Sequence, residues 1–211
     1  MRHLPEAWLR AAAAVGARDD VAHAGVDLLG RYAQMHRRYH DLAHLDDILR
    51  HVEELSDHAR DIAAVRMAAW FHDAVYEPAA PDNEERSARL AESTLLQLRV
   101  DDDVVAEVAR LVRGTADHAP EPGDLNAAVL CDADLAILAS GPERYGLYVE
   151  AVRAEYGHLD DQAFARGRAG VLRGLLGRDR LFSTLTGRDR WEAGARANMT
   201  AELARLGGAD G

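Results

Sequence analysis

Apolar residues recur every three to four positions along most of the chain, a spacing that places them on one face of an α-helix. The clearest apolar stripe consists of Leu42, Leu45, Ile48, Leu49, Val52 and Leu55. Strand signals are close to absent, because no alternation of apolar and polar residues survives more than a few positions. The pattern predicts an all-α fold.

Prolines, glycines and capping residues divide this pattern into helices. Breaks are expected at 77–82, 114–123 and 141–142, where proline and glycine cannot continue a helix. Asp19 and Asp20 are expected to cap the second helix, and Asn83 a later one. The expected helices span 5–15, 21–32, 41–55, 61–71, 83–98, 101–112, 125–138, 143–156, 161–176 and 189–206.

Length and composition narrow the class of protein. The 211 residues suffice for one domain, and no repeat or linker marks a boundary. No apolar run approaches the roughly 20 residues that span a bilayer, and no secretory signal is visible, so no membrane partner is expected. A single cysteine, Cys131, fits a reducing cytoplasm. The net charge of −11 argues against general nucleic-acid binding, which needs concentrated Lys and Arg.

Three clusters of polar residues stand out against the helical pattern. His40 and His44 lie four residues apart at the expected start of a helix, which would turn them to the same side. His72-Asp73 closes an apolar helix, and a third cluster, 131–135, carries Asp132 and Asp134. Each cluster alone fits a hydrogen-bonded structural role. Together they favour one buried metal ion, because burial of such groups is costly unless they are bonded or coordinated.

These residues resemble the HD-domain metal-dependent phosphohydrolases, whose pattern is a histidine, a His-Asp pair and a distant aspartate. Here these are His44, His72-Asp73 and one of Asp132 or Asp134. The resemblance to a bacterial subgroup of predicted HD phosphohydrolases extends through RRYHDLAH, WFHDAVY and NEERSA, and on to 153–156 and 167–168. It implies a phosphodiesterase-like helical bundle: one HD-type domain over 1–211, with a motif core at about 32–140 and helices at about 143–206 packing on it.

The segment 39–44 also resembles the helical cyclic-nucleotide phosphodiesterases, which have Asn where this chain has Asp41. In those enzymes the first histidine donates a proton to the leaving oxygen and the second binds metal, so His40 becomes the expected general acid and His44 a ligand. Their Ala-Asp-Leu motif favours Asp134 over Asp132. Residues two apart on a helix point about 200° apart, so only one can face the ion. Whether Asp41 bonds an imidazole or caps the helix stays open.

The resemblance thus implies four metal ligands, His44, His72, Asp73 and Asp134. Two imidazoles and two carboxylates suit a divalent ion of Mn, Fe, Co, Ni, Zn or Mg, and the sequence does not choose among them. Whether one or two ions bind also stays open. Such an ion lowers the pKa of bound water and polarises a phosphoryl oxygen, which supplies a nucleophile at neutral pH.

Other candidates surround this motif. Arg37 immediately precedes it and is expected to bind phosphate through a two-pronged contact, the alternative being a surface or capping role. Asn83 and Glu84 follow the proline-rich loop and are candidates for the catalytic site, although helix capping and the helix dipole also explain them. The sequence leaves three roles open for His118: binding a second metal ion, binding the substrate and capping a helix.

Arg153 and Tyr156 are expected to line the substrate pocket, with packing as the alternative.

The leading hypothesis is a divalent-metal-dependent phosphohydrolase that acts on a phosphate ester of a small nucleotide or related metabolite. Two alternatives are a di-iron HD-type oxygenase and a non-catalytic, metal-stabilised module that binds a nucleotide or partner. The sequence separates neither monoester, diester and pyrophosphate substrates nor monomer and homo-oligomer.

Overall fold

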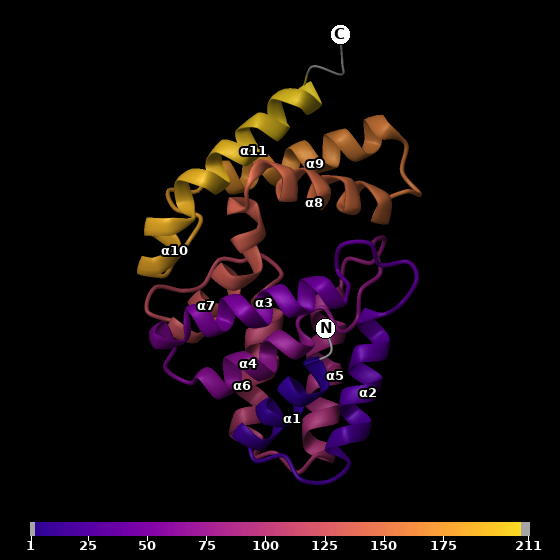
Figure 1. Ribbon diagram of the computed structural model, residues 1–211, viewed down its shortest axis with the longest axis vertical. Helices are drawn as coiled ribbons and strands as arrows, with labels where there is room; N and C mark the ends of the chain where they lie inside the picture. Colours follow the sequence, from indigo (N-terminus) through magenta and orange to yellow (C-terminus); the bar gives the residue numbers. More distant parts are fainter. Residues whose placement is uncertain (1–2, 208–211) are drawn as a thin grey trace.

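The computed structural model describes residues 3–207, and the regular elements in this part of the chain are all helices, without a strand (Figure 1). The all-α prediction is confirmed. The described residues form eleven α-helices and two short 3-10 helices: α1 Leu4–Ala14, α2 Val21–Tyr32, α3 Leu42–Glu54, η1 Ser56–His58, α4 Ile62–Phe71, α5 Asn83–Gln97, α6 Asp102–Arg113, α7 Leu125–Leu135, η2 Ala136–Ala139, α8 Pro142–Glu155, α9 Asp161–Leu176, α10 Leu185–Arg190 and α11 Glu192–Gly207.

The predicted last helix is divided in two. Thr184 starts α10 earlier than expected, because its hydroxyl accepts a hydrogen bond from the Gly187 N–H at 3.0 Å. Trp191 separates α10 from α11. The predicted helix 125–138 likewise ends at Leu135 and tightens into η2.

The structure shows which of the candidate residues cap helices. Asp41 caps α3, since its carboxylate accepts from the N–H groups of Ala43 and His44 at 2.7 and 3.2 Å. That contact answers the question the sequence left open. Asp20 makes no capping hydrogen bond and adopts a left-handed φ of 47°, so its predicted capping role was wrong. Asn83 is the first residue of α5 rather than its cap.

Helix α4 forms the centre of the lower helical core, which comprises α1–α7 in Figure 1. It is buried from Ala64 to Phe71 except at Arg66, and it packs against α1, α3, α6 and α7. The indole of Trp70 meets that of Trp8 edge to face, with ring centroids 5.4 Å apart. Truncating a buried aromatic of this kind costs about 3–5 kcal/mol. This rigid core holds the carboxyl end of α4, where His72 follows.

Helices α8, α9 and α11 lie together above the core (Figure 1). Arg168 of α9 pairs with Glu202 of α11, and Asn198 of α11 donates to the carbonyl oxygens of Leu138 and Ser140. These contacts fix the upper helices to one another and to the end of α7. Within residues 3–207 no single helix is long and apolar enough to cross a membrane; one pair, Leu125–Ala139 with Pro142–Glu155, qualifies only when combined, across a bend of 106°.

Candidate metal centre

Three side chains from three helices converge at the edge of the core. His44 comes from the first turn of α3, His72 from the residue after α4, and Asp134 from α7. One ligand atom from each lies within 4.8 Å of the others, a grouping that could hold a metal ion. The two imidazole Nε2 atoms are 3.0 Å apart, and both rings are buried.

The carboxylate of Asp73 adjoins the same two imidazoles. Its Oδ2 lies 3.1 Å from Nε2 of His72 and 3.4 Å from Nε2 of His44. The Asp134 Oδ1 lies 3.3 Å from His44 and 3.9 Å from His72. Two atoms that bind one ion at about 2.1 Å are about 3.0 Å apart at a right angle and about 3.4 Å apart at the tetrahedral angle. The spacing of His44, His72 and Asp134 therefore suits the ligands of a single divalent ion, and Asp73 lies beside both histidines.

Local contacts aim these imidazoles. The Nδ1–H of His72 donates to the carbonyl oxygen of Ala69 at 2.9 Å, which leaves Nε2 as the nitrogen facing the cluster. A carbonyl in this position fixes the tautomer of a metal-binding histidine. On the other side, the Asp41 cap begins α3 so that His44 falls in its first turn. Both orientations are thus set by the main chain.

The electrostatics of the cluster favour cations. Burial alone would lower the pKa of His44, but hydrogen bonds and charges from Asp134 and Asp73 raise it to about 10. Burial alone would likewise raise the pKa of both carboxyls, yet the surrounding imidazoles hold the pKa of Asp73 and of Asp134 below the usual range. Two ionised carboxylates therefore attract positive charge to this point, which a proton or a metal ion can supply.

Asp132 points to a different part of the molecule. Its carboxylate accepts from the Ser183 N–H at 2.8 Å, and from the N–H and hydroxyl of Thr184, each at 2.7 Å. It thereby anchors the start of α10. The structure brings Asp134, and not Asp132, to the two histidines, as the resemblance favoured.

His118 contacts the cluster from the loop between α6 and α7. Its Nε2 donates to Oδ2 of Asp134 at 2.7 Å, and its backbone has a left-handed φ of 49°. Such a conformation is strained for a residue other than glycine. Arg178 stabilises the loop by donating to the carbonyl oxygens of Asp117 and His118 at 2.6 and 2.7 Å. His118 therefore orients a candidate metal ligand, a role that the sequence did not suggest.

His40 lies beside the cluster but not on the helix that was expected to carry it. It precedes α3, so the prediction that helical spacing aligns it with His44 was wrong. Its Nδ1–H instead donates to Oε2 of Glu155 at 2.7 Å, and its ring stacks on Tyr76 with centroids 4.0 Å apart. The Nε2 of His40 is the nitrogen left without this partner.

Glu155 holds this segment from α8, 115 residues away. Its Oε1 accepts from the N–H groups of Arg38, Tyr39 and His40 at 2.8, 2.9 and 2.9 Å. Burial would raise the pKa of Glu155, but the bonds from His40 and this main chain lower it to about 2. No local pattern distinguishes Glu155 from its neighbours in the sequence, so sequence reasoning missed it.

A cleft of about 600 Å³ opens on the cluster between the core and the upper helices. Its lining includes His40, Asp73, His118 and Asp134. A narrower space of about 400 Å³ shares His40, His118 and Asp134 with it and reaches Arg178, so the two form one cleft with two mouths. The candidate site is therefore open to a ligand of metabolite size.

The structure gives Arg37 a place outside this cleft. Its guanidinium is buried, and Nη1 donates to the carbonyl oxygens of His40 and Asp73 at 2.9 and 2.7 Å. The Nη2 donates to Ala74 at 3.3 Å and Nε to Gln34 at 3.2 Å. Four of its five N–H donors are therefore bound within the protein, and Arg37 supports the loop behind the cluster instead of lining the cleft.

Asn83 and Glu84 both line the cleft but differ in their contacts. Asn83 joins the ends of the proline-rich loop: its side chain accepts from the Glu77 N–H and donates to the carbonyls of Glu77 and Ala80. Glu84 is half-buried and carries no hydrogen bond or ion pair within the described residues. Of this pair, Glu84 keeps a carboxylate available to a ligand.

Arg153 and Tyr156 also differ in their position relative to the cleft. Arg153 donates to the carbonyl oxygens of Tyr156 and Leu159 and pairs with Asp161, so it fastens the turn between α8 and α9. It does not line the cleft, whereas Tyr156 does. The arginine that does line the cleft is Arg168, which the sequence pattern did not single out as a site residue.

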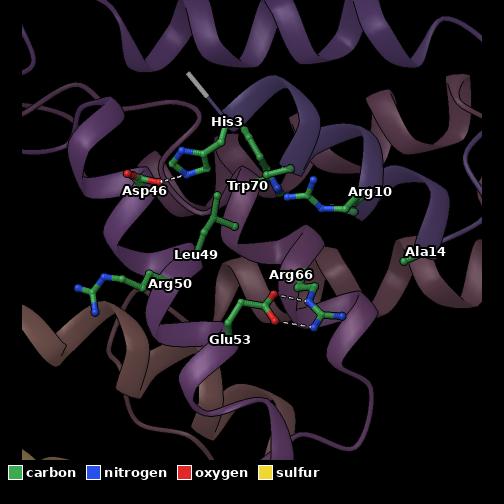
Figure 2. Close-up of a pocket in the computed structure, with 11 residues that line it drawn as sticks. His3, Arg10, Ala14, Asp46, Leu49, Arg50, Glu53, Arg66 and Trp70 are labelled. Atoms are coloured by element: carbon green, nitrogen blue, oxygen red, sulfur yellow. Dashed lines mark hydrogen bonds and ion pairs between the residues drawn. The ribbon is translucent and has the colours of Figure 1, made fainter. Parts of the chain in front are cut away.

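Another groove, of about 510 Å³, lies between α1, α3 and α4 (Figure 2). Two pairs of its polar side chains bind each other: Glu53 with Arg66, and Asp46 with His3. None of the residues of the metal cluster lines it. The candidate chemistry therefore belongs to the cleft and not to this groove.

Comparisons of the chain with protein-family models, with curated proteins and with solved structures found no match.

Proposed function

We propose that this protein is a divalent-metal-dependent phosphohydrolase that acts on a phosphate ester of a small nucleotide or related metabolite. The observation that carries the proposal is the convergence of His44, His72 and Asp134 at the base of an open cleft. Asp73 adjoins them and His40 lies alongside. The motif resemblance to the HD-domain phosphohydrolases supports the same chemistry.

His44, His72, Asp73 and Asp134 would hold one ion of Mn, Fe, Co, Ni, Zn or Mg. When bound, such an ion polarises a phosphoryl oxygen and lowers the pKa of water, which supplies the nucleophile at neutral pH. The chain contributes orientation. The Ala69 carbonyl directs His72, and His118 directs Asp134.

His40 would serve as the general acid. Because its Nδ1–H is held by Glu155, the transferable proton would sit on Nε2. In hydrolysis the oxygen of water bonds to phosphorus, the bond from phosphorus to the leaving oxygen breaks, and that oxygen takes the proton of His40. Stacking on Tyr76 restricts the imidazole to one orientation.

We assign phosphate binding to Arg168 instead of Arg37. Arg168 lines both mouths of the cleft, while Arg37 lines neither.

We also propose a cytoplasmic location, because the chain has a single cysteine, Cys131, and so no internal disulfide.

The test is hydrolysis by protein stripped of metal and reloaded with Mn, Co, Ni or Zn. Aryl phosphates and a nucleotide panel should release phosphate only when an ion is present, and Asp73→Ala should lose both metal and turnover. Absence of turnover with every ion would contradict the proposal. Two irons per chain with oxygen consumption would instead favour the oxygenase, and tight ligand binding without turnover a binding module.

A further inference from the structure

The cleft carries little positive charge. Its charged lining consists of Asp73, Glu84, Asp134 and Arg168, together with two histidines. A di- or triphosphate brings several negative charges, and proteins hold such groups with several Lys or Arg side chains or backbone donors. Among the described residues that line the larger mouth, Arg168 is the one arginine, and there is no lysine.

Part of the Arg168 guanidinium already interacts with other side chains of the protein. Its Nε and Nη2 donate to Glu202 at 2.8 and 3.1 Å, and its guanidinium lies over the Tyr148 ring at 5.1 Å. Tyr145 binds the same carboxylate. The Glu202 charge balances that of Arg168, and Nη1 is the nitrogen without a carboxylate partner. This arrangement suits contact with one phosphoryl group.

The second mouth adds one arginine, Arg178. Two of its nitrogens already donate to the carbonyl oxygens of Asp117 and His118. Asp117 lines the same mouth and contributes a carboxylate. Neither mouth therefore offers a surplus of cations for a chain of phosphates.

The wall opposite the cluster is aromatic and apolar. Helices α8 and α9 and the turn between them contribute Tyr148, Tyr156 and Phe164, with Val152 and Leu159 beside them. The rings of Tyr156 and Phe164 have centroids 6.1 Å apart, and Arg153 lies 4.9 Å from the centroid of the Phe164 ring. Such a wall gives a flat ring a surface for stacking, whereas its apolar and tyrosine side chains offer additional phosphates no positive charge.

We propose that this site selects a phosphate monoester whose alcohol carries a flat aromatic ring, as in a nucleoside monophosphate, over nucleoside di- and triphosphates. The proposal rests on the proposed function of the same site. The single phosphoryl group lies between the metal cluster and Arg168, and the ring lies against Tyr156 and Phe164. Hydrolysis then yields inorganic phosphate and the free nucleoside.

The test compares adenosine mono-, di- and triphosphate with ethyl phosphate, using protein loaded with the most active ion. The monophosphate should have kcat/KM about tenfold or more above both the triphosphate and ethyl phosphate, since stacking and charge each contribute. Faster phosphate release from the di- or triphosphate would overturn the selectivity while leaving a phosphohydrolase in place.

Measurements of substrate binding test the selectivity separately from the proposed hydrolase activity. If no compound is turned over, the proposed hydrolase fails, and calorimetry of the metal-loaded protein still measures selectivity. A lower Kd for adenosine monophosphate than for the triphosphate supports the inference, and the reverse order overturns it.

A pair of variants tests the stacking wall. Phe164→Leu keeps an apolar side chain but removes the ring, so KM for adenosine monophosphate should rise about tenfold, several times more than KM for ethyl phosphate. The control is Leu147→Ala, on the exposed side of α8 and outside the cleft, which should change neither. Equal effects of Phe164→Leu on both substrates would overturn the placement of the ring.

Discussion

The Nε2 atoms of His44 and His72 lie 3.0 Å apart, although the two histidines are 28 positions apart in the sequence, one in α3 and the other just after α4. Two lone pairs held that close, in a buried setting, need a shared proton or a shared ion. Asp73 and Asp134 supply the negative charge that either would balance. This relationship underlies the predictions that follow.

Two aspartates of α7 form a matched test of the cluster. Asp134→Asn should lower metal affinity at least about tenfold, because it weakens both a ligand and the contact to His118. Asp132→Asn should retain the metal but lower the free energy of unfolding by about 1–2 kcal/mol, because Asp132 holds Ser183 and Thr184. Metal titration and urea denaturation of both variants check this. Equal metal affinity in the two would contradict it.

Metal binding should release a proton at neutral pH. The folded-state pKa of His44 is raised to about 10, so the metal-free protein carries an imidazolium there at pH 7 that an ion must displace. Metal affinity should rise with pH until about 10. In the metal-free protein the stabilisation from this raised pKa is complete below the unfolded value, about 6.5, and is lost as pH rises through about 10.

Calorimetric metal titration in buffers of different ionisation enthalpy measures that proton. About one proton per ion is expected at pH 7. A heat independent of the buffer would show that no proton leaves, which would contradict the assigned charge state of His44.

Arg37 should act on stability rather than on substrate. Arg37→Lys cannot reproduce the fork that reaches His40, Asp73 and Ala74, so the free energy of unfolding should fall by about 2–4 kcal/mol with KM unchanged. Arg38→Lys is the control, because Arg38 is exposed and, within residues 3–207, only its main-chain N–H is bound. A large rise in KM without loss of stability would restore the phosphate-binding role.

Periodicity and capping residues predicted most helices within a few residues of their ends, since both depend on neighbouring positions. The three polar clusters in the sequence predicted one buried metal ion, and the choice of Asp134 over Asp132 came from the family resemblance. The roles of Arg37 and Glu155 were out of reach, because their partners are main-chain atoms supplied by segments distant in the sequence. The early start of α10 escaped for the same reason, since its N-terminal residue Thr184 is held by the distant Asp132.

Glu155 should affect the rate of catalysis through His40. Glu155→Gln removes the charge that holds Nδ1–H, so kcat should fall about tenfold to hundredfold and the pH-rate profile should shift, while metal content stays unchanged. Glu150→Gln, an exposed position on the same helix, is the control. An unchanged kcat and profile in Glu155→Gln would show that this contact is structural only.

The proposed function requires that one divalent ion bind between His44, His72, Asp73 and Asp134. Anomalous diffraction from crystals of the Mn- or Zn-loaded protein tests it directly. The expected result is a single peak within about 2.0–2.2 Å of both Nε2 atoms and of a carboxylate oxygen of Asp134. A loaded protein whose anomalous peak lies elsewhere, with no density between the two imidazoles, would contradict it.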